Sequence, residues 1–242
     1  MKMIKLDAID STNSYLKRLL LTENINDFTV VVSKHQTNGR GRNGNLWVNK
    51  PSLNLAFSVY KRFINFSVNE KFMLNVVSSV SVYEVLKKYK LNNLTIKWPN
   101  DIMTENKKIA GILIENSVRG NKINHSVIGI GININQSQFL DLPNATSVFL
   151  ESGNKHSVDK IAVELKDAVE KNFTNFELKE TELIEFYNNV LFKRNIIADF
   201  TTVNAKKIQG TIIGVNKEGT LSLKQKNHKV FEYSENQIKM EI

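Results

Sequence analysis

The sequence contains no cysteine, only 3 prolines, and no apolar run of the roughly 18 residues that a membrane-spanning helix needs. Without cysteine, the chain has no disulfide, no thiolate metal site and no thiol nucleophile, so side-chain packing must stabilise it. The N-terminus leads at once into the charged Lys5 and Asp7, which excludes a hydrophobic signal region there. We therefore expect a cytoplasmic protein that does not enter a membrane.

Arginine is also scarce, because only 6 of the 33 basic residues are arginine. The formal net charge of +9 would attract nucleic acid if it were concentrated on one surface. The lysines instead occur singly or in pairs along the whole chain, without long basic blocks. This distribution favours a general lysine bias over a nucleic-acid-binding patch.

The hydrophobic pattern over residues 1–190 predicts a mixed α+β fold. Alternating or continuous apolar runs indicate strands, and apolar residues at helical spacing indicate helices. Ser67 and Glu70 have the spacing of a capping box at the start of one helix. Because strands and helices occupy separate stretches, we expect a mixed or antiparallel sheet. Strands are expected at 4–9, 28–35, 53–60, 94–98, 107–116 and 124–133, with helices after residue 13, from 67 to about 89, and from 157 to about 190.

The character of the sequence changes after residue 190. From residue 195 onward, five short alternating runs are separated by turn residues. This pattern predicts a small SH3-like β-barrel that follows the larger α+β unit. We therefore divide the chain into a larger domain at residues 1–190 and a small C-terminal β domain at residues 191–242.

A glycine-rich stretch, QTNGRGRNGNLW at residues 36–47, lies between two expected strands. It does not open a helix after a strand, as P-loops and Rossmann fingerprints do. Its glycines let a ligand approach the backbone closely, and Arg40 and Arg42 provide donors suited to carboxylate or phosphate. The alternative is a flexible linker whose arginines lie on the protein surface.

A second stretch, KWPND at residues 97–101, lies at the end of an expected strand. Trp98 and Pro99 fit a core residue followed by a residue that stops the strand. Asn100 and Asp101 could hold Mg²⁺ or orient an amine, because both offer side-chain oxygens. The alternative is an ordinary turn in which these side chains bond only to the nearby backbone.

Two later stretches place polar residues in buried strands. In KKIAGILIEN, at residues 107–116, Lys108 enters the strand and Gly111 leaves room for a flat group against it. A solvated surface lysine is the alternative. In GIGININ, at residues 129–135, asparagines such as Asn133 could bond to the edge of a nucleotide base, or could simply end a core strand.

These stretches follow one another in an order that resembles the biotin protein ligases, also called biotin–acetyl-CoA-carboxylase ligases. The order is Ser11-Thr12-Asn13, GRGRNGNLW, KWPND, KKIAGILIE and GIGININ, followed by a small β domain. The resemblance covers nearly the whole chain, and KWPND followed by KIAGIL is its most specific part. It implies a catalytic domain of the biotin/lipoate ligase type at residues 1–190 and an SH3-like barrel at residues 191–242.

The resemblance also implies an ATP-dependent ligase. Enzymes of this family join biotin to ATP as biotinyl-5′-AMP, release pyrophosphate, and pass the biotinyl group to one lysine of a biotin carboxyl carrier protein. ATP, Mg²⁺ and biotin are therefore the implied ligands, and the carrier protein is the implied partner. The glycine-rich loop is expected to fold over the adenylate and exclude water.

The site residues implied by the resemblance fall into three groups. The catalytic group is Lys108, Arg40, Arg42 and Asp101. Asp101 is expected to position or deprotonate the acceptor lysine. The biotin-binding group is Ser11, Thr12, Asn13, Gln36, Gly39, Arg40, Lys108 and Gly111. The adenylate-binding group is Arg42, Trp47, Asn100 and Asn133, and Asn100 is also the implied Mg²⁺ ligand.

The chain departs from the family pattern at two places. Asn43 and Asn45 stand where the family's loop commonly has further arginines, which bears on how tightly the adenylate is retained. The catalytic domain starts at residue 1, without the helix-turn-helix domain that some members carry, so we expect no specific DNA binding. Some members pair through sheet edges, which leaves a homodimer open for this chain.

Two other functions stay open. A lipoate or octanoate ligase or transferase would share the fold, but its glycine loop is expected to have an R-R-x-S-G-G-G-like pattern that this sequence lacks. A basic, β-rich module that binds nucleic acid would carry the ligase residues only as vestiges. Its binding would weaken steeply with salt, which distinguishes it from an enzyme that binds biotin.

Overall fold

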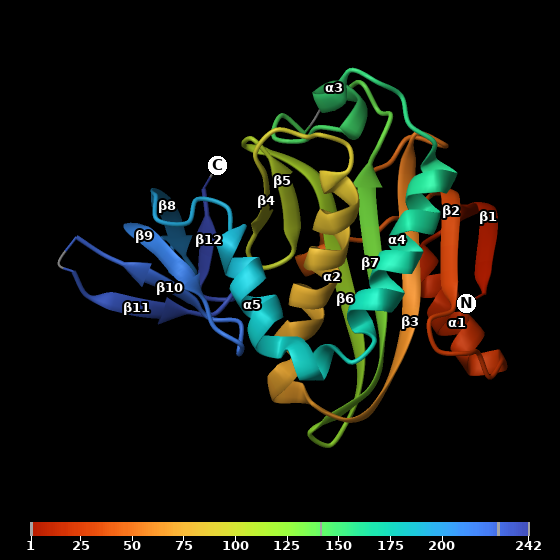
Figure 1. Ribbon diagram of the computed structural model, residues 1–242, viewed down its shortest axis with the longest axis horizontal. Coiled ribbons are helices and arrows are strands. Elements are labelled where there is room, and N and C mark those ends of the chain that lie inside the picture. The colour runs from red at the N-terminus through yellow and green to blue at the C-terminus, as the bar shows by residue number, and fades with distance from the viewer. Residues whose placement is uncertain (1, 141, 227, 242) are drawn as a thin grey trace.

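The computed structural model describes residues 2–140, 142–226 and 228–241, which form two β-sheets with helices around the larger one (Figure 1). The larger sheet has the strand order β1-β2-β3-β7-β6-β5-β4. β1 pairs with β2 in parallel and the other neighbours are antiparallel, so the expected mixed sheet is confirmed. The strands are β1 (Met3–Ile9), β2 (Val30–Gln36), β3 (Asn54–Ser67), β4 (Leu94–Lys97), β5 (Asp101–Thr104), β6 (Lys107–Arg119) and β7 (Lys122–Asn133).

Helices cover both faces of this sheet. Successive strand residues point to opposite faces, so neighbouring residues of one strand pack against different helices. Val30 on β2 belongs to the main core, which includes α2 and α4, whereas the next residue, Val31, packs with Leu16 of α1. α1 therefore lies on the face opposite to α2 and α4. The helices are α1 (Thr12–Thr22), α2 (Lys71–Lys87), α3 (Val148–Ser152), α4 (Val158–Phe173) and α5 (Glu180–Asn189), with short 3-10 turns η1 (Arg42–Gly44), η2 (Val68–Glu70) and η3 (Phe176–Lys179).

Side-chain caps fix where two helical segments begin. The expected capping box is present: Ser67 Oγ accepts from the amide of Asn69 at 3.2 Å, and Glu70 accepts from the amide of Ser67 at 3.1 Å. It opens the turn η2, which leads directly into α2. Ser11 caps α1, since its hydroxyl accepts from the amide of Ser14. The next residue, Thr12, holds the start of α1 against the end of β2, because its amide donates to Gln36 Oε1 at 2.8 Å.

The KWPND stretch turns back on itself and starts a strand that its sequence pattern does not predict. Asp101 begins β5 and pairs with Lys97 at the end of β4. β5 has only four residues, and Ile102, Met103 and Thr104 are all buried. A run this short and uniformly buried has no alternation that would reveal a strand. The hairpin places Asn100 and Asp101 together beside β6.

The second sheet contains five antiparallel strands in the order β11-β10-β9-β8-β12, which matches the expected small SH3-like domain. It is tied to the larger sheet by Trp98, whose Nε1 donates to the carbonyl of Gly219 at 3.0 Å. Asn188 of α5 bonds both to the amide and to the carbonyl of Val215. The predicted domain boundary near residue 190 stays a prediction. The strands are β8 (Ile197–Thr202), β9 (Lys207–Val215), β10 (Leu221–Lys224), β11 (Val230–Tyr233) and β12 (Ile238–Met240).

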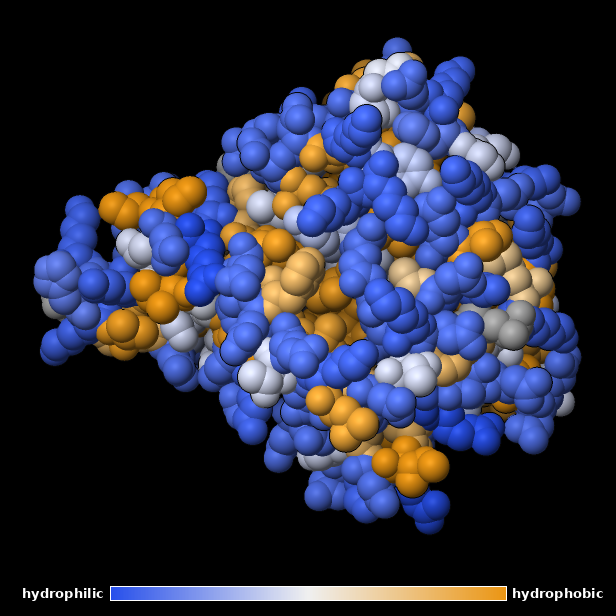
Figure 2. All heavy atoms as spheres, in the orientation of Figure 1, coloured by the Kyte–Doolittle hydropathy of each residue, from blue (hydrophilic) through white to orange (hydrophobic). Residues whose placement is uncertain are grey.

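The surface of the second sheet carries several hydrophobic side chains among polar ones. Figure 2 shows them as orange spheres on the lobe at the left. In this part of the chain, Ile197, Val203, Ile213 and Val230 are exposed. No helix in the described part of the chain is both long and apolar enough to span a bilayer.

Candidate active site

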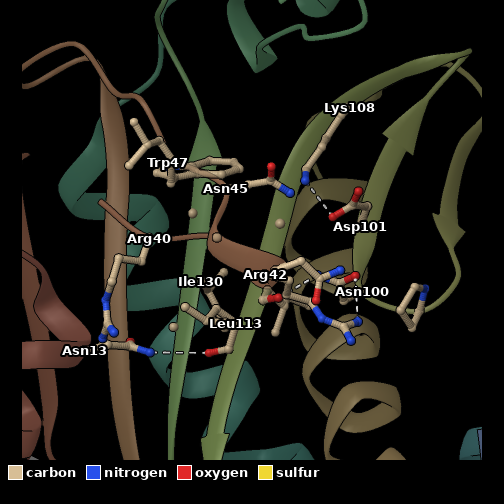
Figure 3. A pocket seen from close by; sticks show the side chains of 18 of the residues that line it. Asn13, Arg40, Arg42, Asn45, Trp47, Asn100, Asp101, Lys108, Leu113 and Ile130 are labelled. Atoms are coloured by element: carbon tan, nitrogen blue, oxygen red, sulfur yellow. Dashed lines mark hydrogen bonds and ion pairs between the residues drawn. The ribbon is translucent and has the colours of Figure 1, made fainter. Parts of the chain in front are cut away.

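A cavity of about 320 Å³ lies on the face of the larger sheet that carries α1 (Figure 3). Its floor is the backbone of β6 and β7, where glycines take the place of larger residues. A Cβ added to Gly131 would lie 2.3 Å from Trp47 Cε2, and one added to Gly129 would lie 2.4 Å from Asn13 Oδ1. Neither position has room for a side chain, because the indole and the amide fill that space. The glycines of GIGININ thus shape the cavity floor.

The glycine-rich loop between β2 and β3 forms a short β-hairpin beside this cavity. Arg40 bridges to Leu46 on the returning arm. The amide of Asn45 donates to the carbonyl of Arg42 at 3.0 Å and closes the turn. The loop is therefore an ordered element with its own backbone hydrogen bonds, and both of its arginines are held in defined places.

Asn43 and Gly44 form the tip of the hairpin, with φ angles of 55° and 76°. A type I′ turn requires positive φ at both central residues, and Asn-Gly is a strongly favoured pair there. An arginine at position 43 would be less stable in this left-handed conformation, because it lacks the short amide with which asparagine can bond to the local backbone. The turn geometry therefore gives a physical reason for asparagine at this position.

The indole of Trp47 covers part of the glycine floor. A Cβ added to Gly111 would lie 3.0 Å from Trp47 Cζ3 and 3.0 Å from Lys108 Cε. Lys108 Nζ lies 5.6 Å from the centre of a Trp47 ring, which is within cation–π range. Part of the space that Gly111 leaves is thus filled by the protein's own side chains. The hairpin places an apolar wall directly beside a cation.

One end of the cavity is cationic. Lys108 Nζ lies 2.7 Å from Asp101 Oδ1, so the lysine is fixed beside the β4–β5 hairpin. Arg42 donates to Asn100 Oδ1 at 3.2 Å and also pairs with Glu235, which follows β11 in the second sheet. Figure 3 shows Lys108 pointing toward Asp101 and Arg42 beside Asn100, so these four side chains meet from three separate parts of the chain.

Lys97 and Lys239 add two more cations to the lining of this end. Burial lowers the pKa of Lys97 below its ordinary value; the charge of Asp101 opposes this effect, and those of Lys108 and Lys239 reinforce it. Several cations in a partly closed space repel one another unless an anion lies between them. This end of the cavity therefore favours an anionic ligand.

The opposite end is close to neutral, because Arg40 is paired with Glu115, and its other polar side chains are linked by hydrogen bonds. The backbone amide and the hydroxyl of Thr12 donate to Gln36 Oε1 at 2.8 and 3.0 Å. Ser58 Oγ lies within hydrogen-bond distance of both Thr12 Oγ1 and Asn13 Oδ1. These groups come from α1, β2 and β3. Together they suit a ligand that is polar but uncharged.

The structure brings most of the predicted site residues together. The cavity is lined by Ser11, Thr12, Asn13, Gln36, Arg40, Arg42, Trp47, Asn100, Asp101, Lys108 and Gly111. Gly39 lies against the hairpin, where a Cβ would be 2.3 Å from the carbonyl oxygen of Trp47. Asn133 is buried at the end of β7, and its Nδ2 donates to the carbonyl of Thr146 at 2.9 Å. The side chain of Asn133 thus serves the fold, and its contact with adenine stays a prediction.

Several lining residues were not predicted from the sequence. Lys97 belongs to KWPND, but its position in an expected strand does not mark it as a site residue. Leu113 lies two residues after Gly111 on β6, so the alternation of strand faces could have selected it. Glu235 and Lys239 come from the second sheet, and nothing in their local sequence indicates that they reach this cavity.

The sequence profile of the Biotin/lipoate A/B protein ligase family matches residues 6–133, which is more than half of the chain. The chain belongs to this family. The matched region runs from β1 to the end of β7, so it contains the hairpin, the KWPND turn and the glycine floor of the cavity. The family profile does not cover the second sheet, which supplies Glu235 and Lys239.

Individual relatives are similar over different lengths. The chain is 30% identical over 225 residues to the bifunctional ligase/repressor BirA of Salmonella typhimurium, covering 91% of this chain and 68% of that protein, so it spans about two thirds of that relative. It is 33% identical over 127 residues to the biotin–[acetyl-CoA-carboxylase] ligase of Paracoccus denitrificans, covering 52% of this chain and 51% of that one.

A solved structure shows that the fold of this ligase-family member is shared along its length. The biotin protein ligase from Aquifex aeolicus in complex with biotin and ATP superposes with a TM-score of 0.82 at 24% identity. The match covers 99% of this chain and 98% of the other, so it includes both sheets.

Proposed function

We propose that this protein is a biotin protein ligase, which activates biotin with ATP as biotinyl-5′-AMP and transfers the biotinyl group to one lysine of a biotin carboxyl carrier protein. The observation that carries the proposal is the polarity of the cavity: a neutral hydrogen-bonding end, an apolar middle and a cationic end. Biotin has the same three parts in the same order, namely a ureido ring, an apolar body and a carboxylate. Relatives named as biotin ligases support the same substrate.

The polarity of the cavity sets the orientation of biotin. The ureido ring lies among Thr12, Gln36 and Arg40, because this end offers hydrogen bonds without a strong excess of charge. The apolar body packs against Trp47 and the glycine floor. The carboxylate then points at Lys108, at the border between the two ends of the cavity. This placement brings the reacting group of biotin next to the site for ATP.

ATP occupies the cationic end in the first step. A carboxylate oxygen of biotin attacks the α-phosphorus, a new P–O bond forms, and pyrophosphate leaves with the electron pair of the broken bond. Both reactants are anions, so Lys97, Lys108 and Arg42 offset their repulsion and stabilise the charge that develops on the phosphate. Trp47 and Asn100 lie where they can border the bound nucleotide.

The second step transfers the biotinyl group to the carrier protein. The acceptor lysine must be neutral before its amine attacks the carbonyl carbon of the mixed anhydride, and AMP then leaves. Asp101 is the carboxylate nearest to Lys108 in the cavity, which supports its role in positioning this amine or accepting its proton. The incoming amine therefore meets an existing ion pair between Asp101 and Lys108.

Mg²⁺ accompanies ATP in the proposed reaction, and Asn100 is its predicted ligand. In the structure, Asn100 Oδ1 already accepts from Arg42, and Nδ2 donates to the carbonyl of Ile112 at 2.7 Å. The described residues also contain no group of three or more His, Cys, Asp or Glu side chains that could hold a metal ion. These side chains do not form a dedicated Mg²⁺ site, and we assign no step to the ion.

The experiment that tests the proposal is exchange of labelled pyrophosphate into ATP. Exchange should depend on biotin and should be weak with lipoate or octanoate, the substrates of the alternative ligase or transferase. Transfer is then measured as biotin incorporated into a biotin carboxyl carrier protein, with a carrier whose acceptor lysine is replaced by arginine as control. A preference for lipoate or octanoate would overturn the assignment to biotin.

Three further expectations remain predictions within this proposal. They are a cytoplasmic location, the lack of specific DNA binding, and the option of a homodimer. Sedimentation with and without biotin and ATP measures the oligomeric state. Titration with duplex DNA at two salt concentrations separates specific binding from the salt-sensitive attraction that any basic protein shows.

A further inference from the structure

Glu115 on β6 connects three elements at the neutral end of the cavity. Its Oε2 accepts from Asn13 Nδ2 at 2.8 Å and lies 3.1 Å from Arg40 Nη2. Its Oε1 lies 2.8 Å from Lys17 Nζ. The carboxylate therefore ties α1 and the glycine-loop hairpin to the central sheet at one point.

The side chain of Glu115 is shielded but charged. Only 22% of it is exposed. Burial would raise the pKa of Glu115, but the hydrogen bonds from Lys17 and Asn13 and the charge of Arg40 outweigh this effect and hold the pKa below its ordinary value. An ionised carboxylate makes stronger hydrogen bonds than a neutral acceptor, so it can fix the geometry of the donors around it.

Arg40 depends on this carboxylate for its orientation. Within the described part of the chain, Glu115 is the side chain that accepts from the Arg40 guanidinium. The Nε of Arg40 is buried and has no partner among the described residues. Buried donors are nearly always paired in folded proteins, so an unpaired one at a cavity points to an acceptor on a ligand.

The same carboxylate orients Asn13. Because an ionised carboxylate only accepts hydrogen bonds, it faces the amide nitrogen of Asn13, and the amide oxygen then faces Ser58 Oγ. Gln36 Oε1 accepts from the backbone amide of Thr12 at 2.8 Å, which orients the Gln36 amide independently of the Ser58 and Thr12 hydroxyls. Since Gln36 uses its oxygen for Thr12, its amide nitrogen is the group left for a ligand. The charge on Glu115 therefore sets the orientation of the Asn13 amide at this end of the cavity.

We propose that Glu115 is a positioning residue for the ureido end of biotin, because it holds Arg40 and Asn13 so that this end presents donors to the ureido carbonyl. The inference rests on the proposed function and adds a residue that acts on substrate recognition only through its neighbours. Arg40 and Asn13 lie on the side of the cavity away from Lys108 and Asp101 (Figure 3). Loss of Glu115 therefore affects binding of biotin and spares binding of ATP.

The test compares Glu115→Ala and Glu115→Gln with Lys5→Ala in biotin-dependent pyrophosphate exchange. Lys5 is the matched control, because it also forms an ion pair with a carboxylate, that of Asp159, but is 57% exposed and does not line the cavity. For Glu115→Ala, KM for biotin rises about tenfold or more while KM for ATP changes less than about twofold. Glu115→Gln keeps an oxygen for Asn13 but no charge for Arg40, so its KM for biotin lies between those of wild type and Glu115→Ala. Lys5→Ala behaves as wild type.

The proposal would be overturned by an equal rise of both KM values, by a fall in kcat alone, or by an unchanged KM for biotin in both Glu115 variants. Circular dichroism and thermal unfolding check that each variant is folded, and the isosteric glutamine variant decides the outcome if the alanine variant unfolds. A wild type without biotin-dependent exchange would refute the proposed function itself. The wild-type measurement thus separates failure of the function from failure of the role of Glu115.

Discussion

The carboxylate of Glu235 lies 2.5 Å from the guanidinium of Arg42, which joins the second sheet to the tip of the glycine-loop hairpin. Both side chains are partly shielded, with 25% of Arg42 and 37% of Glu235 exposed. Asn100 accepts from the same guanidinium, so Arg42 is held between two parts of the chain. The second sheet is therefore part of the wall of the site and positions a residue of the loop.

Replacing Glu235 by glutamine should loosen the hairpin without unfolding the protein. A partly exposed ion pair contributes less than about 1 kcal/mol, so Tm should change by no more than roughly 4 °C. The amides of the hairpin should exchange with deuterium several times faster, because local opening becomes more frequent. Hydrogen-exchange mass spectrometry of residues 36–47 measures this. Glu232→Gln on β11 is the matched control, and equal exchange in the two variants would contradict a role for the ion pair.

The tip of the hairpin gives a second prediction. Asn43→Gly should keep the loop ordered, because glycine also adopts positive φ without strain, whereas Asn43→Val should cost about 1–2 kcal/mol at this position. The valine variant should release biotinyl-5′-AMP faster, as measured by trapping the released adenylate. Asn43→Arg adds a cation but strains the turn, so its release rate reports which effect is larger. Equal release from the glycine and valine variants would show that turn geometry does not control retention.

Burial of Lys97 predicts a conflict between stability and activity. Lys97→Met should raise Tm by roughly 2–4 °C, because it removes a partly buried cation, and should slow adenylate formation. Burial lowers the pKa of Lys97 in the folded state below its ordinary value of 10.5. Between the folded-state pKa and 10.5, the unfolded chain binds more protons than the folded chain, so the free energy of unfolding of the wild type rises with pH. The stability gap between the variants should therefore be widest near neutral pH and shrink toward pH 10.5. Denaturant unfolding across this range measures the gap, and a constant gap would argue against the shift.

The sequence motifs predicted the cavity well where each motif carries a local signal. The glycine-rich stretch was placed between two strands because strands of high β-propensity flank it. Lys108 was selected because it enters an apolar strand, and the structure places it at the cationic end of the cavity. These inferences needed only the periodicity of short segments and their order along the chain.

Long-range pairing explains what the sequence could not reveal. Glu235 and Lys239 reach the cavity only because the second sheet packs beside the KWPND hairpin, and no short segment encodes that contact. The sequence pattern does not predict β5, because its three buried residues, Ile102 to Thr104, form too short a run beside a proline and an asparagine. The Asn43-Gly44 pair does carry a local signal for a hairpin. Comparison with the arginines of the family's loop does not use this signal.

Lys108 and its neighbour provide the sharpest test of the catalytic assignment. Lys108→Ala should reduce biotin-dependent pyrophosphate exchange by about 10² to 10³, because it removes a cation from the place where negative charge develops. Lys107→Ala is the matched control, since Lys107 is the preceding residue on β6, is exposed and does not line the cavity. The fold should survive both changes, because Lys108 is 35% exposed and its ion pair with Asp101 lies at the cavity. Comparable activity of the two variants, measured at saturating biotin and ATP, would remove Lys108 from the reaction and leave its contact with Asp101 as a structural one.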